Sequence, residues 1–144
     1  MGAGEYSLAV LTEANTLTPE LETLLARAMF PDPGRIRRTL ESYRTDPTRR
    51  VFAWVVEGRP VSTAGIQQRD GEVEVLHLGT APGEERRGHA RTLLHALAAY
   101  LNTGHVVAET DDEAVEFYRR AGFEVTPIPS PRERARYRCV LTLS

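Results

Sequence analysis

The stretch EVEVLHLGTAPGEERRGHARTLL, residues 72–94, decides the expected fold because it joins a strand to a helix through a basic turn. Residues 72–80 are rich in side chains that favour strands, and a stripe of leucines at helical spacing predicts a helix over 89–101. Between them lies Arg86-Arg87-Gly88-His89-Ala90. The first amides of a helix have no partners within it, and the helix dipole is positive there. With a glycine that lets the backbone approach a ligand, this turn is suited to a phosphate or pyrophosphate.

Taken alone, the turn also fits a solvated corner with no ligand. It lacks the Gly-Lys-Ser/Thr of a nucleotide-binding P-loop and the three spaced glycines of a dinucleotide fold. The rest of the chain must therefore decide between the two interpretations.

Outward from this stretch, apolar spacing and turn signals predict eleven elements. They are a strand over 6–11, helices from 18 to about 30 and over 35–43, strands over 50–56, 61–68 and 72–80, a helix over 89–101, a strand over 105–109, a helix over 112–121, and strands over 123–128 and 134–143. The order β-α-α-β-β-β-α-β-α-β-β predicts an α/β (α+β) class protein, with helices packed on a mixed sheet. Residues 1–144 are expected to form a single domain.

A second motif lies further along the chain, in TDDEAVEFYRRAGF, residues 110–123. Thr110 or Asp111 is expected to cap its helix, and Gly122 stands where a left-handed residue ends one. Together, the two motifs resemble the coenzyme A signature of the GNAT N-acetyltransferase superfamily. Gly88 and Ala90 match the end of its Gln/Arg-x-x-Gly-x-Gly/Ala pattern, whereas Glu85 departs from the pattern. The second motif resembles the family's Asn-x-x-Ala-x-x-Phe-Tyr-x-x-x-Gly-Phe segment, with Asp111 in place of the usual Asn.

The resemblance implies a GNAT acyl-CoA N-acyltransferase fold and acetyl-CoA, or coenzyme A, as co-substrate. It implies that the strand over 72–80 is bulged near its end and splays from its neighbour, and that Gly79 marks a bulge or a close backbone approach. Tyr118 would protonate the departing thiolate. The cofactor-binding residues expected on these grounds are Leu78, Gly79, Thr80, Arg86, Arg87, Gly88, His89, Ala90, Arg91, Asp111 and Tyr118.

The base that takes the amine's proton is open. Glu72, Glu74 and His77 lie on the strand beside the expected site, and each is also a plausible solvated strand residue. Strand alternation places Glu72 and Glu74 on one face and His77 on the other. Glu74 is the candidate that we carry forward, with a water chain as its alternative.

Composition excludes several classes of protein. A net charge of −2 argues against a general nucleic-acid binder, and no apolar run is long enough to span a membrane. We expect a cytoplasmic, bacterial protein without a secretory signal. The one cysteine, Cys139, predicts a buried apolar residue, and the spacing of the four histidines predicts no metal site. The arginines at 132, 134, 136 and 138 predict a solvated edge, or alternatively a site for an anionic acceptor or acidic partner.

Three hypotheses follow. The leading one is an N-acetyltransferase that transfers the acetyl group of acetyl-CoA to a primary amine of a small molecule or peptide, by direct attack in a ternary complex. A non-catalytic acyl-CoA sensor of the same fold is the alternative, and an arginine-rich interaction domain without a cofactor is the third. Phe30, Tyr43, Trp54 and the loop over 127–138 are expected to shape the acceptor site. The protein is expected to be a monomer or homodimer.

Overall fold

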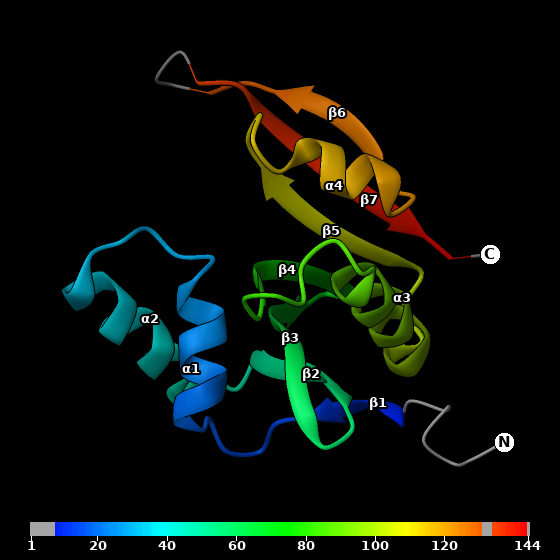
Figure 1. The fold of residues 1–144 in the computed structure, drawn as a ribbon. Helices are drawn as coiled ribbons and strands as arrows, with labels where there is room; N and C mark the ends of the chain where they lie inside the picture. The colour runs from blue at the N-terminus through cyan, green and yellow to red at the C-terminus, as the bar shows by residue number, and fades with distance from the viewer. Residues whose placement is uncertain (1–7, 131–133, 144) are drawn as a thin grey trace, which may run out of the picture.

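The computed structural model describes residues 8–130 and 134–143. Their strands form one seven-stranded sheet in the order β1-β2-β3-β4-β5-β7-β6 (Figure 1). The strands are β1 (Ala9–Glu13), β2 (Arg49–Val56), β3 (Arg59–Arg69), β4 (Glu72–Thr80), β5 (His105–Thr110), β6 (Glu124–Ile128) and β7 (Arg136–Thr142). The helices are α1 (Pro19–Ala26), α2 (Pro33–Thr45), α3 (His89–Leu101) and α4 (Val115–Arg120). The predicted element order is confirmed.

The helices begin where the sequence provides a cap and a proline. Thr18 accepts a hydrogen bond from the Leu21 amide at the start of α1, and Asp32 accepts two from the start of α2. A proline follows each cap at the first helical position, where its missing N–H costs nothing. Helix α1 ends at Ala26, earlier than the predicted limit near residue 30, so residues 28–32 form a loop that becomes part of the site described below.

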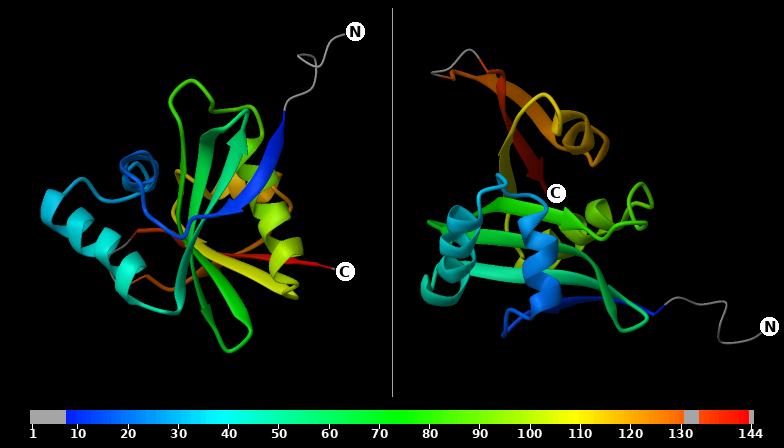
Figure 2. Two further views of the ribbon diagram at one scale, coloured as in Figure 1. Left: turned by 90° about the horizontal axis from the view of Figure 1, so that it is seen from below. Right: turned by 60° about the vertical axis from the view of Figure 1, so that its left-hand side comes forward.

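Helices cover both faces of the sheet (Figure 2). On one face, α1 and α2 pack on β2, β3 and β4, and on the other α3 packs on the same three strands while α4 packs on β6 and β7. The larger core lies on the α3 side and includes Phe52, Ile66, Leu93, Leu94 and Leu97. The smaller core, around Leu25, Leu40, Tyr43 and Val51, lies beneath α1 and α2.

Strand β4 is the strand at which the sheet splits, because it diverges from its neighbour β5. It pairs with β3 along its length, but the register shifts where Ile66 faces Val75 and Gly65 faces His77. Leu76 is therefore an extra residue, which makes a β-bulge. Parallel pairing with β5 stops at Val75, so the rest of β4 has a free edge and the two strands diverge. The predicted bulge is present, three residues before Gly79.

Gly79 has the second role that was predicted for it, a close backbone approach. A Cβ at this position would overlap the backbone carbonyl of Leu24 in α1. The absence of a side chain therefore lets α1 lie directly against β4, which fixes the helix that borders the divergent strands.

Some boundaries differ from prediction. The first strand is β1, Ala9–Glu13, rather than 6–11, and residues 6 and 7 lie outside the described residues. Helix α4 begins at Val115 instead of residue 112, because residues 112–114 form a turn. Strand β7 lies between β5 and β6, so it is not the sheet edge that its arginines predicted. Arg132 lies outside the described residues.

Across the described part of the chain, helices long and apolar enough to cross a membrane are absent.

Candidate active site

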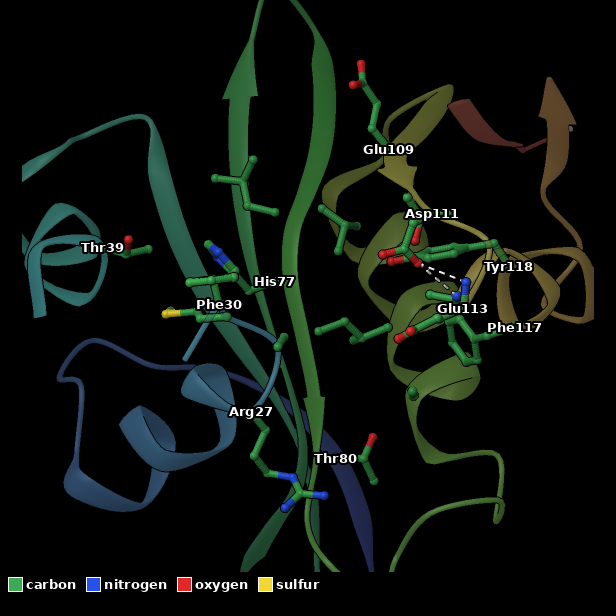
Figure 3. A pocket seen from close by; sticks show the side chains of 18 of the residues that line it. Arg27, Phe30, Thr39, His77, Thr80, Glu109, Asp111, Glu113, Phe117 and Tyr118 are labelled. Atoms are coloured by element: carbon green, nitrogen blue, oxygen red, sulfur yellow. Dashed lines mark hydrogen bonds between the residues drawn. The ribbon is translucent and has the colours of Figure 1, made fainter. Parts of the chain in front are cut away.

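A cavity of about 710 Å³ lies where β4 and β5 diverge (Figure 3). One wall comes from the α1–α2 loop and α2, with Phe30 and Thr39, and the opposite wall comes from the end of β5 and from α4, with Asp111 and Tyr118. In Figure 3, Tyr118 and His77 lie on opposite sides of β4. The cavity is therefore lined by residues from both faces of the sheet, which meet in the gap between β4 and β5.

A second cavity of about 700 Å³ adjoins the first at the loop that leads into α3. The two share Arg27, Leu78, Thr80, Ala90 and Phe117 as lining residues. A long ligand can therefore extend from the loop, past the free edge of β4, to Tyr118. We call the second cavity, beside this loop, the coenzyme half. The acceptor half is the part of the first, slightly larger cavity that lies between β4 and the α1–α2 loop.

The loop has the backbone geometry of an anion site. Arg86 and Gly88 both have positive φ values, of 64° and 80°. Gly88 is the N-cap of α3 and has no side chain that could cap the first helical amides. Apart from the residue itself and its two chain neighbours, no described atom lies within 4 Å of where its Cβ would be, so that space is open. Converging backbone N–H groups at a helix N-terminus bind phosphates well.

The predicted cofactor residues converge on these two cavities with one exception. The residues that line the coenzyme half are Leu78, Gly79, Thr80, Arg86, Gly88, His89, Ala90 and Arg91, whereas Asp111 and Tyr118 line the larger cavity. Arg87 lines neither cavity; its side chain is exposed and lies 3.6 Å from Glu84. The position of the Arg87 side chain therefore does not support its predicted role in binding the cofactor.

Glu85 lies in the coenzyme half, and its partner was not foreseen. Its carboxylate is 3.6 Å from the guanidinium of Arg27, the C-cap residue that follows α1. Arg27 lines both cavities, so this pair spans the mouth of the coenzyme half. Sequence spacing could not have indicated it, because 58 residue numbers separate the two partners.

Tyr118 is buried and held by neighbouring rings. Phe117 and Phe123 meet it edge to face, with ring centroids 5.1 and 5.2 Å away. Burial, with a smaller contribution from Cys139, raises the pKa of the Tyr118 hydroxyl well above its ordinary value. Tyr118 therefore keeps its proton at neutral pH and is available as a proton donor.

Asp111 shapes the turn before α4. Its carboxylate accepts hydrogen bonds from the amides of Glu113 and Ala114, at 3.0 and 3.2 Å. The predicted cap is thus Asp111 rather than Thr110, although the residues it caps form a turn and not helix. Cys139 is buried as expected.

The three candidate bases are placed differently from expectation. Val73 and Val75 belong to the core on the α3 side, so Glu74 between them points to the opposite face. His77 contacts Tyr43 of α2 and therefore lies on the same face as Glu74. The predicted opposition of these two residues is wrong, because the bulge at Leu76 reverses the alternation.

Of these residues, only His77 lines the larger cavity. Glu72 and Glu74 line a separate hollow beyond the bulge, together with Gln67, Arg69 and Asp70. Burial raises the pKa of Glu74, with Glu109 and Glu72 adding to the effect. The position of Glu74 does not support a role as the base.

His77 is held by a residue that the sequence did not link to it. Its Nδ1 lies 2.6 Å from the hydroxyl of Tyr43. Burial, and to a lesser extent the charge of Arg49, lowers the pKa of His77 to about 4. His77 is therefore neutral at physiological pH.

Of the other residues expected to shape an acceptor site, Phe30 lines the cavity, whereas Trp54 packs against the core on the α3 side.

The described residues contain no group of three or more His, Cys, Asp or Glu side chains that could hold a metal ion.

Residues 17–123 match the model of the Acetyltransferase (GNAT) family. The chain belongs to the GNAT acetyltransferase family. It is therefore an acyltransferase, and acetyl-CoA is the co-substrate of this family. The match includes both motifs, the bulged β4 and α1 and α2.

Solved structures of similar fold support the architecture. A GNAT family acetyltransferase from Elizabethkingia anophelis with acetyl-CoA bound aligns with a TM-score of 0.70 and 16% identity, covering 94% of this chain and 98% of that one. The ribosomal-protein-S18-alanine N-acetyltransferase from Escherichia coli aligns with a TM-score of 0.70 and 17% identity over 95% of each chain. An acetyltransferase from Thermus thermophilus has a TM-score of 0.70 and 22% identity, covering 92% of this chain and 97% of that one.

Proposed function

We propose that this GNAT protein transfers the acetyl group of acetyl-CoA to a primary amine of a small molecule or peptide, by direct attack in a ternary complex. The continuity of the two cavities carries this proposal. A pyrophosphate bound at the loop over 86–91 leaves room for the pantetheine arm along the free edge of β4. The acetyl group then reaches the larger cavity beside Tyr118, where an amine can enter from the α1–α2 side.

The residues divide the chemistry between them. The loop amides and Arg86 would hold the pyrophosphate. A backbone N–H near Leu78, on the free edge of β4, would polarise the thioester carbonyl. Tyr118 would protonate the coenzyme A thiolate as the C–S bond breaks, because its hydroxyl is still protonated at neutral pH and is therefore available as the donor. The protein then exchanges protons with solvent to restore its starting state.

A non-catalytic acyl-CoA sensor of the same fold is the alternative. Glu85 and Asp111, which depart from the family pattern, favour it. The position of Tyr118 in the first cavity, next to Phe117, which lines both cavities, favours the enzyme. The cytoplasmic location, the bacterial origin and the monomeric or homodimeric state of the protein stay predictions.

Two measurements test the proposal. Thermal unfolding with acetyl-CoA should show a higher melting temperature, because a ligand of the native state stabilises it. Release of free thiol should then follow when an amine is added from a panel of polyamines, aminoglycosides, amino acids and peptides. A melting shift without thiol release from any amine supports the sensor, and the absence of a melting shift at saturating acetyl-CoA contradicts both.

A further inference from the structure

The acceptor half contains a buried pair that the roles above do not use, Tyr43 and His77. They come from different layers, Tyr43 from α2 and His77 from β4, and their side chains meet at 2.6 Å. Their rings lie edge to face, with centroids 5.8 Å apart. Tyr43 is almost fully buried, so its hydroxyl is committed to this contact and is not a general solvent-facing group.

Glycine at position 65 makes the contact between Tyr43 and His77 possible. Gly65 lies on β3, directly opposite His77 across the strand pair. A Cβ at Gly65 would overlap the hydroxyl of Tyr43. The ring of Tyr43 therefore crosses β3 at the one point where the strand has no side chain, and it reaches the next strand.

The bulge supplies the second half of the arrangement. Regular alternation would turn His77 toward α3, where it would enter the larger apolar core. The extra residue Leu76 turns it toward α2 and the cavity instead. The bulge and Gly65 act on adjacent strands, and both are needed for His77 to meet Tyr43.

The charges around His77 come from several elements. Arg49 of β2 lies with its guanidinium 5.6 Å from the Tyr43 ring centroid, and Glu74 shares the same face of β4. The charged residues that line the same cavity are Arg27, Arg35, Glu109, Asp111, Glu113 and Arg136. Three are basic and three acidic, so they do not impose a strong net charge on the imidazole.

We propose that His77 accepts the proton of the acceptor amine and that Tyr43, seated over Gly65, is the positioning residue that orients the imidazole; this inference rests on the proposed function. In the tautomer with hydrogen on Nδ1, Nδ1–H donates to the Tyr43 oxygen and Nε2 is free to accept. The amine nitrogen bonds to the acetyl carbon, its proton moves to Nε2, and the C–S bond breaks. Tyr118 gives its proton to sulfur, and solvent returns one proton to Tyr118 and takes one from His77.

Substitutions with matched controls test this assignment. His77→Gln should lower kcat about 100-fold, in line with the loss of a general base, while the dissociation constant for acetyl-CoA stays within about two-fold because the loop over 86–91 is intact. His105→Gln changes an exposed histidine outside both cavities and should keep full activity. If Glu74→Gln abolished turnover while His77→Gln retained it, the assignment to His77 would be overturned.

Tyr43→Phe separates positioning from packing. The ring remains, so folding and acetyl-CoA binding should be preserved, but phenylalanine cannot accept a hydrogen bond from the imidazolium. We expect kcat to fall about 10-fold. With kcat/KM corrected for the fraction of neutral amine, the acid limb should move to lower pH. Tyr100→Phe, at an exposed tyrosine outside both cavities, is the control. An unchanged pH profile in Tyr43→Phe would contradict the positioning role.

Folding and the parent proposal can be checked separately. Circular dichroism and acetyl-CoA binding report whether each variant folds, and Tyr43→Phe remains informative if His77→Gln does not. If the wild type released no thiol with any amine, the proposed function would fail. If the wild type turned over and folded His77→Gln did so equally, the His77 inference alone would fail.

Discussion

The coenzyme half and the acceptor half of the cleft are built by different means. Most of the coenzyme half comes from one continuous stretch, residues 78–91, with Arg27 and part of α4 completing its lining, so the geometry of its loop depends on neighbouring residues and their backbone angles. The acceptor half is assembled from β3, β4, α2 and the α1–α2 loop, and its Tyr43–His77 pair joins residues 34 positions apart. A local site tolerates changes elsewhere in the fold, whereas an assembled site depends on the packing of every element that contributes to it.

Tyr118→Phe gives the largest expected effect, because Tyr118 is the proposed proton donor to the leaving thiolate. Loss of the hydroxyl should lower kcat by roughly 100-fold, the lower end of what general acids contribute. Affinity for coenzyme A should stay nearly unchanged, because the loop amides are untouched. Single-turnover thiol release and calorimetric titration measure the two quantities. Equal turnover by Tyr118→Phe and wild type would rule out Tyr118 as the acid.

Gly79→Ala should break the link between the halves by pushing α1 away from β4. The added Cβ would meet a backbone carbonyl rather than a flexible side chain, so we expect unfolding to become easier by about 1–3 kcal/mol. Gly104→Ala is a matched control, because a Cβ there meets nothing within 4 Å and its φ is not positive. Urea unfolding of both variants makes the comparison, and similar stabilities would show that α1 can move without loss.

The acceptor half should also show a pH signature in stability. The pKa of His77 is about 4 in the folded protein, below the ordinary value of about 6.5 for an unfolded chain. The unfolded state therefore binds more protons between these two values, and stability should fall as the pH drops through this window. His77→Gln should remove that part of the pH dependence. Chemical unfolding at a series of pH values tests it, and parallel curves for the two proteins would contradict the buried neutral imidazole.

The smallest expected effect is in the coenzyme half. Glu85 is more than half exposed and pairs with Arg27 in the coenzyme half, where we expect it to compete with a coenzyme A phosphate for the same guanidinium. Glu85→Gln should tighten coenzyme A binding a few-fold at low salt, with the gain lost at high salt. Glu124→Gln, exposed on β6, changes the net charge equally and serves as control. Weaker binding by Glu85→Gln would mean that its carboxylate helps to hold the loop.

The sequence by itself determined the order of the elements, the glycine-containing turn before α3 and the position of Tyr118. These depend on local signals, such as a glycine before a helix and apolar spacing, which act over a few residues. Ten of the eleven predicted cofactor residues line the two cavities for this reason; Arg87 does not, and its exposed side chain lies near Glu84 instead.

Only the tertiary structure decided the acceptor half. A one-residue bulge at Leu76 reversed the face of His77, and strand alternation alone could not place it. Gly65 looked like an ordinary strand glycine until Tyr43 of α2 was seen to cross it. In the coenzyme half, the pair of Arg27 and Glu85 likewise depends on packing, since α1 lies directly against β4 at Gly79. Each of these contacts joins segments far apart in the chain, and their geometry is fixed by how helices and strands pack rather than by the neighbours of any residue in the sequence.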